Sequence, residues 1–202
     1  MSGLNRRAVL LAAGAGLAVQ TAVAQTAAGQ PAAKSAPTSK ALREMQIYKV
    51  PELALSIWVE NQPPWEVELS QATGRPSFVV QSPDNYHPPT IMTYASWPNE
   101  RVTASNMSQV AQTASARASQ NFGLNASQAR SVVKLPATHG VLNGLAGTFV
   151  GQVDGTAMDV QIFVGQAEGR FPVALSIYTL AGKMKHLNEV VRRSWGQLAY
   201  LP

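Results

Sequence analysis

Apolar and polar residues alternate in short runs through the first half of the chain, as in half-buried β-strands. Each run is rich in β-branched and aromatic residues, and Pro, Gly, Asn or Asp clusters separate the runs. We therefore expect an antiparallel ladder to open the fold. The predicted strands are Leu53–Val59, Trp65–Leu69, Ser77–Gln81 and Thr90–Trp97, with breakers at 61–64, 73–76 and 82–85.

The pattern changes near Ser105, where apolar residues recur every three or four positions, as on one face of a helix. Much of this stripe is alanine, which lets a helix lie close to a sheet. Gly123 is in the right place to end the helix as a C-terminal cap. The predicted buried stripe is Met107, Val110, Ala111, Ala114, Ala118 and Phe122, and the predicted solvent face is Gln109, Gln112, Ser119 and Gln120.

Alternation returns in the second half, in the runs Leu145–Val153 and Ala157–Val164. Asp154-Gly155 lies between them, and this dipeptide is typical of a two-residue hairpin because both turn positions need positive φ. A further turn at 167–170 leads to the run Phe171–Thr179. We expect a meander of at least three strands, joined by a strand at Arg130–Leu135.

The last segment, Gly182–Tyr200, has the period of a second amphipathic helix. Along the chain, strands, a helix, more strands and this second helix follow one another. This order predicts an α+β fold, a mainly antiparallel sheet flanked by helices. The predicted buried face carries Met184, Leu187, Val191, Trp195 and Leu198, and the opposite face carries His186, Glu189 and Arg193.

This order of elements resembles the DcrB/PsbP-like group over roughly residues 47–201. The similar segments are Trp65-Glu-Val-Glu-Leu69, Pro76-Ser-Phe-Val-Val-Gln-Ser-Pro-Asp84 and Gly147-Thr-Phe-Val-Gly-Gln-Val-Asp-Gly155. In that group a W-x-V strand, an F…SPD strand and a late meander form an α/β sandwich. Members include extrinsic photosystem subunits, envelope lipoproteins and chaperone-like binders of secreted effectors. The resemblance implies a PsbP-like α/β sandwich that serves as a non-enzymatic binding or accessory module.

The N-terminal residues have the organisation of a signal peptide, predicted to span 1–24. Arg6 and Arg7 precede the uncharged run Ala8–Val19, which is shorter than the roughly 20 residues that cross a bilayer as a helix. Ala22 and Ala24 then give a small-x-small cleavage pattern. We expect export to the periplasm, and the competing interpretation is an N-terminal helix that stays with the protein.

The paired arginines favour the twin-arginine route, which exports folded proteins, over the general route. The surrounding residues 5–10 depart from that signal at Asn5, where Ser or Thr is usual, and at Val9, where Phe is commonest. The following residues 25–45 are mostly small and polar and read as a flexible linker. Residues 46–202 then form a single predicted globular domain.

Charge and composition exclude several classes of partner and chemistry. The formal net charge is +5, and the predicted signal peptide carries two of the basic residues. The other basic residues are scattered, so nucleic-acid binding is not expected. With no cysteine in the chain, thiol catalysis, thiolate metal sites and an N-terminal lipid anchor are excluded. No second apolar run is long enough to cross a membrane after cleavage.

No catalytic constellation stands out. The three histidines, His87, His139 and His186, have no metal-binding spacing, and there is no G-x-S-x-G elbow. His186 and Glu189 are three residues apart on a helix, but a solvated face is the favoured interpretation. Asp159 alternates with apolar neighbours and is expected to point outward. We therefore predict no metal, no cofactor and no catalytic residue.

Aromatic residues beside prolines are the candidate contacts for a partner, because rigid apolar groups lose little entropy on docking. The competing interpretation is that each ring completes the core. The predicted binding residues are Trp58, Trp65, Tyr86, His87 and Trp97. The leading hypothesis is an envelope accessory protein that binds a protein or hydrophobic partner through a sheet edge or these loops. The alternatives are a small periplasmic enzyme with a site on its loops, and a lipid binder at the membrane surface.

Overall fold

The computed structural model describes residues 45–202, except 72–74, 104, 126–127, 129–131 and 133–134. The predicted signal peptide, with Arg6, Arg7, Ala22 and Ala24, lies outside the described residues, and so does nearly all of the predicted linker. In the part that is described, no helix is long and apolar enough to span a membrane.

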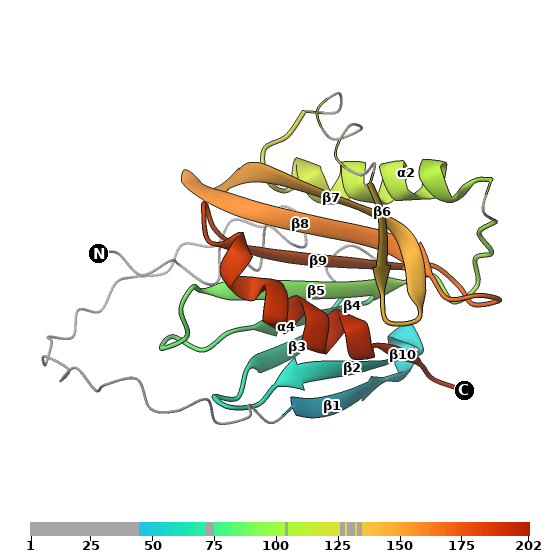
Figure 1. The fold of residues 1–202 in the computed structure, drawn as a ribbon, viewed down its shortest axis with the longest axis horizontal. Helices are drawn as coiled ribbons and strands as arrows, with labels where there is room; N and C mark the ends of the chain where they lie inside the picture. Colours follow the sequence, from blue (N-terminus) through green and yellow to red (C-terminus); the bar gives the residue numbers. More distant parts are fainter. Residues whose placement is uncertain (1–44, 72–74, 104, 126–127, 129–131, 133–134) are drawn as a thin grey trace, which may run out of the picture.

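A seven-stranded antiparallel sheet forms the centre of the fold, in the order β3-β4-β5-β9-β8-β7-β6 (Figure 1). The predicted hairpin at Asp154-Gly155 is confirmed, since these residues have φ of 48° and 75° and join the two longest strands. The predicted strand Ser77–Gln81 is observed with those bounds. The strands are β3 (Glu66–Ser70), β4 (Ser77–Gln81), β5 (Thr90–Ser96), β6 (Leu135–His139), β7 (Leu142–Val153), β8 (Thr156–Gln166) and β9 (Val173–Leu180).

A second, three-stranded antiparallel sheet has the order β1-β2-β10, with β1 (Met45–Val50), β2 (Leu55–Glu60) and β10 (Ala199–Tyr200). The prediction that a strand begins at Leu53 was wrong by two residues. Pro51–Leu53 form a 3-10 turn, η1, and Ala54 then adopts a left-handed conformation with φ of 51°. This turn reverses the chain so that β1 and β2 pair.

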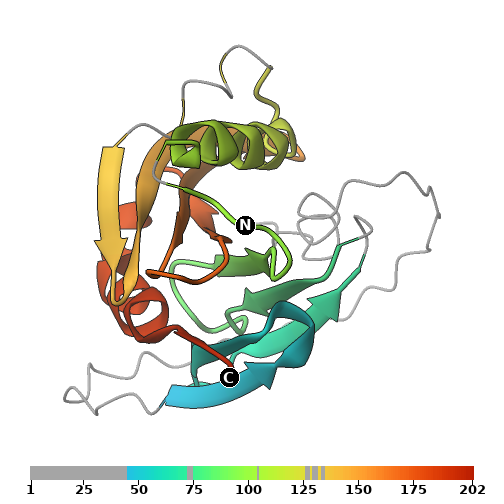
Figure 2. The same cartoon turned by 90° about the vertical axis from the view of Figure 1, so that its right-hand side faces the viewer.

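The two faces of the large sheet are covered by different elements (Figures 1 and 2). Helix α2 (Met107–Gln120) packs on β7 and β8 at one face. Helix α4 (Asn188–Ser194) and the three-stranded sheet cover the other face. The larger core cluster lies between this face of the large sheet and the elements that cover it. The predicted α+β class, antiparallel with flanking helices, is confirmed.

The end of α2 confirms the predicted cap and corrects the predicted solvent face. Gly123 has φ of 76°, its N–H donates to the carbonyl of Gln120, and the Leu124 N–H reaches Ser119. These two bonds form a Schellman cap. Ser119, predicted to be exposed, is completely buried together with Ser115. The small hydroxyl side chains face the sheet because they permit a close approach.

Of the predicted strand Arg130–Leu135 only Val132 and Leu135 are described, and Leu135 opens strand β6, which continues to His139. A two-residue turn at Gly140 and Val141 follows, with Gly140 at φ of 56°, and it pairs His139 with Leu142. Residues 129–131 and 133–134 lie outside the described part of the chain.

The predicted C-terminal helix is broken into several elements. The turn η2 (Met184–Leu187), helix α4, the turn η3 (Trp195–Gln197) and strand β10 replace one continuous helix. Four of the five predicted buried positions are confirmed, because Leu187, Val191, Trp195 and Leu198 are buried, whereas Met184 is half-buried. The chain leaves the helix at Leu198, whose ψ of 134° is extended, and this allows β10 to join β2.

Candidate binding site

Two of the predicted binding residues, Trp65 and Tyr86, belong to the core. Their side chains are 4% and 7% exposed and meet edge to face, with ring centroids 4.9 Å apart. Aromatic pairs of this geometry stabilise a core beyond the area they bury. In this conformation neither ring offers a surface to a partner.

The other three predicted residues are accessible but lie apart. Trp58 is half-buried on the outer face of β2, opposite Ile47, which is 48% exposed. His87 is exposed just before β5, and Trp97 is half-buried just after it. Since β5 has seven residues at about 3.4 Å each, its two ends are roughly 20 Å apart, and His87 and Trp97 lie beyond opposite ends. The structure does not bring these side chains together into one site.

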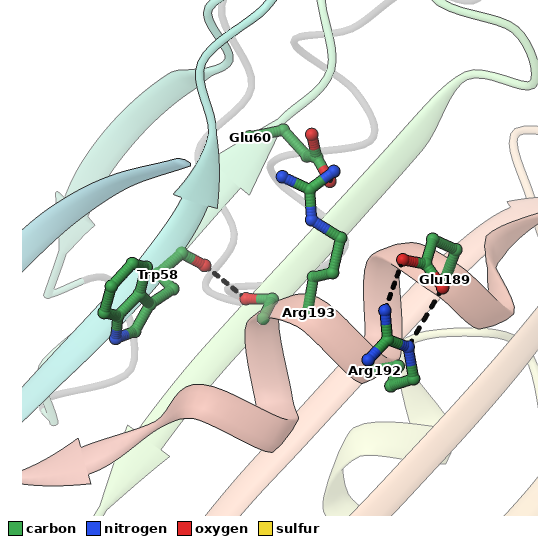
Figure 3. A network of polar contacts seen from close by, with 6 residues as sticks. Trp58, Glu60, Glu189, Arg192 and Arg193 are labelled. Atoms are coloured by element: carbon green, nitrogen blue, oxygen red, sulfur yellow. Dashed lines mark hydrogen bonds and ion pairs between the residues drawn. The ribbon is translucent and has the colours of Figure 1, made fainter. Parts of the chain in front are cut away.

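The polar residues between α4 and β2 form a structural network (Figure 3). The Ser194 hydroxyl donates to the carbonyl oxygen of Trp58 and lies 2.6 Å from the hydroxyl of Tyr94. Burial raises the pKa of Tyr94 well above its ordinary value, so this phenol stays protonated. These contacts seal the edge of β2 that β10 leaves uncovered.

The same network corrects the predicted exposed face of the last helix. His186 and Glu189 are exposed, and Glu189 binds Arg192 through two hydrogen bonds of 2.6 and 3.0 Å. Arg193 instead turns toward β2, where its Nη1 lies 3.4 Å from Oε1 of the buried Glu60 (Figure 3). The buried carboxylate of Glu60 needs a counter-ion, and the guanidinium of Arg193 supplies it. Arg193 therefore contacts the interior instead of lying on the predicted exposed face.

The remaining titratable candidates also have structural positions. His139 packs edge to face against Phe163 and Trp195, at 4.8 and 5.0 Å between centroids, and burial lowers its pKa. Asp159 accepts a hydrogen bond from the backbone N–H of Met184 at 3.1 Å and so holds the start of η2. Within the described residues, no three His, Asp or Glu side chains converge in a way that could hold a metal.

The most distinctive surface feature is the outer edge of β7. Strand β6 pairs with residues 142–146 of β7, and no described strand pairs with Gly147–Val153 on that side. The outward edge is limited at one end by Leu135, which pairs with Ala146. At the other end the N–H of Gln152 donates to the carbonyl of Phe122 at 2.9 Å.

The register shows which backbone groups point out of this edge. The residues beside a two-residue hairpin turn form a hydrogen-bonded pair, so Val153 bonds Thr156 and odd-numbered residues of β7 face β8. The N–H and C=O groups of even-numbered residues face the other way. The bond from Gln152 to Phe122 agrees with this alternation. Consequently the backbone groups of Thr148 and Val150 point outward, where no described residue takes them up.

A groove of about 530 Å³ follows this edge. Its lining includes the consecutive β7 residues Thr148–Gln152 together with Ala157 of β8. None of the described lining residues is ionisable. The lining residues are Phe122, Gly123, Leu124, Gln128, Val132, Thr148, Phe149, Val150, Gly151, Gln152 and Ala157. We name this site the β7-edge groove.

Two glycines of β7 bring the wall of the groove close to the strand. A Cβ on Gly151 would lie 2.5 Å from Cβ of Phe122, and a Cβ on Gly147 would overlap the carbonyl oxygen of Val132. Asn125 and Gln128 exchange two hydrogen bonds of 3.0 Å, which matches the reciprocal pattern of a capping box. The described wall residues are thus held against β7 by backbone contacts.

A second depression of about 560 Å³ lies between the start of α2 and the ends of β7 and β8. Its lining includes Met107, Asn143 and Glu168, and Gln166 beside them donates to the carbonyl of Val102 at 2.7 Å. It has no open strand edge.

Sequence reasoning expected a sheet edge as a contact surface without naming the β7 edge. The available signal was the spacing of Gly147 and Gly151 within an otherwise strand-like run, since glycine in a strand marks the close approach of another backbone.

Comparison with known proteins gives a fold and no family. No protein-family model and no curated protein matches the sequence. A crystal structure from Bacteroides thetaiotaomicron shares the fold at a TM-score of 0.51 and 11% identity, over 77% of this chain. This chain spans only 48% of that protein.

Two further crystal structures are more distant. One is a Pseudomonas aeruginosa protein of unknown function described as a putative regulator (TM-score 0.44, 8% identity, 78% of this chain and 98% of the other). The other is LpqN, involved in cell envelope biogenesis in Mycobacterium tuberculosis (TM-score 0.40, 15% identity, 68% of this chain and 79% of the other). At these TM-scores neither supports an inference about function. The chain is thus an α+β protein that shares its fold with a protein of Bacteroides thetaiotaomicron.

Proposed function

We propose that this chain is a periplasmic accessory protein of the cell envelope that binds a protein or hydrophobic partner without transforming it. Its N-terminal sequence supports export, and the order of its elements supports a DcrB/PsbP-like binding module. The observation that carries the proposal is the β7-edge groove, whose described lining residues carry no charge and include the exposed apolar Val150. Surfaces of this kind mark contact sites because a monomer gains nothing from exposing them.

The groove offers a partner an anchored aromatic ring and an exposed apolar side chain. Phe122 meets Phe149 and Tyr178 edge to face at 5.9 and 4.9 Å, so the ring that forms the wall is anchored in the core. Beside it Val150 is 63% exposed, the most exposed large apolar side chain described on this edge. A rigid wall and an exposed apolar residue give a partner area to bury without a large ordering cost.

Photo-cross-linking in cells of the native host tests the proposal. The full-length protein carries p-benzoylphenylalanine at Val150, at Trp58 or at Glu68, which is exposed on β3 at the opposite edge of the large sheet. We expect defined adducts from Val150 in the periplasmic fraction and none from Glu68. Adducts from Trp58 alone would move the contact to the predicted aromatic residues. No adduct from either position would contradict the proposed function.

A further inference from the structure

The second depression, between the start of α2 and the ends of β7 and β8, contains two amide side chains that lie next to each other. Asn143 and Gln166 are direct cross-strand partners. The next pair on the same face is Leu145 and Val164, which belong to or pack against the core cluster that α2 covers. Because side chains alternate between the faces of a strand, Asn143 and Gln166 also lie on the α2 face, with Cβ atoms about 4.5–5.5 Å apart. We name these two residues the amide pair.

Part of the hydrogen-bonding capacity of each amide is already used. The hydroxyl of Thr138 donates to Oδ1 of Asn143 at 3.0 Å. Nε2 of Gln166 donates to the carbonyl of Val102 at 2.7 Å, which ties the chain that leads into α2 to strand β8. The N–H donors on Nδ2 of Asn143 and the acceptor Oε1 of Gln166 are left. Oε1 is buried, and no described residue donates to it.

These remaining groups define the chemistry of an occupant. A buried acceptor without a donor is costly, so an occupant must donate to Oε1 of Gln166, and it can accept from Nδ2 of Asn143. The exposed carboxylate of Glu168 lines the same depression and takes a further donor. An ammonium group can only donate and a carboxylate can only accept. A hydroxyl does both, and neighbouring hydroxyls supply several donors.

We infer that this depression binds a neutral saccharide, whose hydroxyls bond the amide pair and Glu168. Its apolar lining residues Met107 and Leu145 suit the C–H groups of a sugar ring. Its volume of about 560 Å³ lies within the roughly 300–1,000 Å³ of small-molecule sites. The described residues that line it are all different from those of the β7-edge groove, so this inference is independent of the proposed function.

Two isosteric variants separate a hydroxyl ligand from a cation. Asn143→Asp replaces the Nδ2 donors by an oxygen and keeps the acceptor for Thr138, so a sugar oxygen would then face another acceptor. We expect it to weaken saccharide binding by about tenfold or more. Glu168→Gln keeps an acceptor and removes the charge, so it should weaken saccharide binding by less than about fivefold. Asn188→Asp is the matched control, because Asn188 is exposed on α4 at the other face of the sheet.

NMR spectra of the full-length protein, labelled with nitrogen-15, report directly on the side-chain N–H groups of the amide pair. The probes are glucose, galactose, mannose and N-acetylglucosamine. N-methylacetamide, n-butylammonium and acetate are the comparison compounds for an amide, a cation and an anion. We expect at least one sugar to shift the side-chain signals of Asn143 and Gln166 and to saturate at roughly millimolar concentration. The comparison compounds should leave these signals in place.

Several outcomes would overturn the inference. These are the absence of a saturable shift with all four sugars, and equal binding by Asn143→Asp and the Asn188→Asp control. Shifts with n-butylammonium that Glu168→Gln abolishes would make the depression a cation site, and shifts with N-methylacetamide alone would make it a peptide site. Unchanged backbone signals elsewhere in the sheet establish that Asn143→Asp is folded, and Asn143→Ala is the second variant if it is not. Cross-linking at Val150 succeeds or fails separately, so each proposal can fall without the other.

Discussion

The close contact between Gly151 and the residue that follows α2 makes a quantitative prediction. In Gly151→Ala the added Cβ would lie 2.5 Å from Cβ of Phe122, 2.9 Å from its carbonyl oxygen and 3.2 Å from Cε2 of Phe149. Two of these neighbours are held in place, because Phe122 O accepts the Gln152 N–H at 2.9 Å and the Phe122 ring is packed against Tyr178. The clash cannot be relieved by rotating a flexible side chain.

The expected cost follows from this geometry. Overpacking a well-filled site costs about 1–3 kcal/mol, and Gly-to-Ala substitution returns about 0.4–1 kcal/mol by reducing the entropy of the unfolded chain. We therefore expect a net loss of about 1–2 kcal/mol in the free energy of unfolding. For a domain of this size that corresponds to a fall in Tm of roughly 2–8 °C.

Urea denaturation followed by tryptophan fluorescence measures this loss, with Gly196→Ala as the matched control. A Cβ on Gly196 meets nothing within 4 Å and its φ is not positive, so this variant should be neutral or slightly stabilised. If Gly151→Ala were as stable as the control, the chain after α2 would not be held against β7, and the rigid wall inferred for the groove would be refuted.

Three further predictions test other parts of the structure. Burial lowers the pKa of His139, so the folded state disfavours its protonation. The free energy of unfolding should therefore fall as the pH drops below 6.5, the ordinary pKa of histidine. Urea midpoints measured between pH 8 and 5 should fall less in His139→Phe than in the unchanged protein. Trp195→Ala removes a completely buried ring and should cost about 3–5 kcal/mol in urea denaturation, or prevent folding. Replacing both Arg6 and Arg7 by Lys should retain the protein in the cytoplasm, as seen by cell fractionation, whereas normal export would exclude the twin-arginine route.

Local rules account for the elements that could be predicted. The hairpin between β7 and β8 depends on Asp154-Gly155 alone, and the end of α2 on Gly123, so each can be read from a few adjacent residues. The buried faces of both helical regions follow from apolar spacing for the same reason. The fold class needs no more than the order of these elements.

Contacts between segments far apart in sequence determine the features that could not be predicted. Ser119 is buried because α2 lies close to the sheet, which helix periodicity does not reveal. The C-terminal helix stops early because residues 199–200 pair with β2, a partner far away in sequence. The β7-edge groove depends on β6 being shorter than β7, and register of this kind is not visible in either strand by itself.

The position of β10 has a consequence for biogenesis. This strand pairs with β2, while Leu201 donates to the carbonyl of Ala54 at 2.9 Å and accepts a bond from Arg170 at 2.7 Å. The smaller sheet therefore joins segments made early and late in translation, and it cannot close on the ribosome before residues 199–201 emerge. Because its strands are far apart in sequence, closure of this layer is expected to be slow compared with formation of the local hairpins of the large sheet.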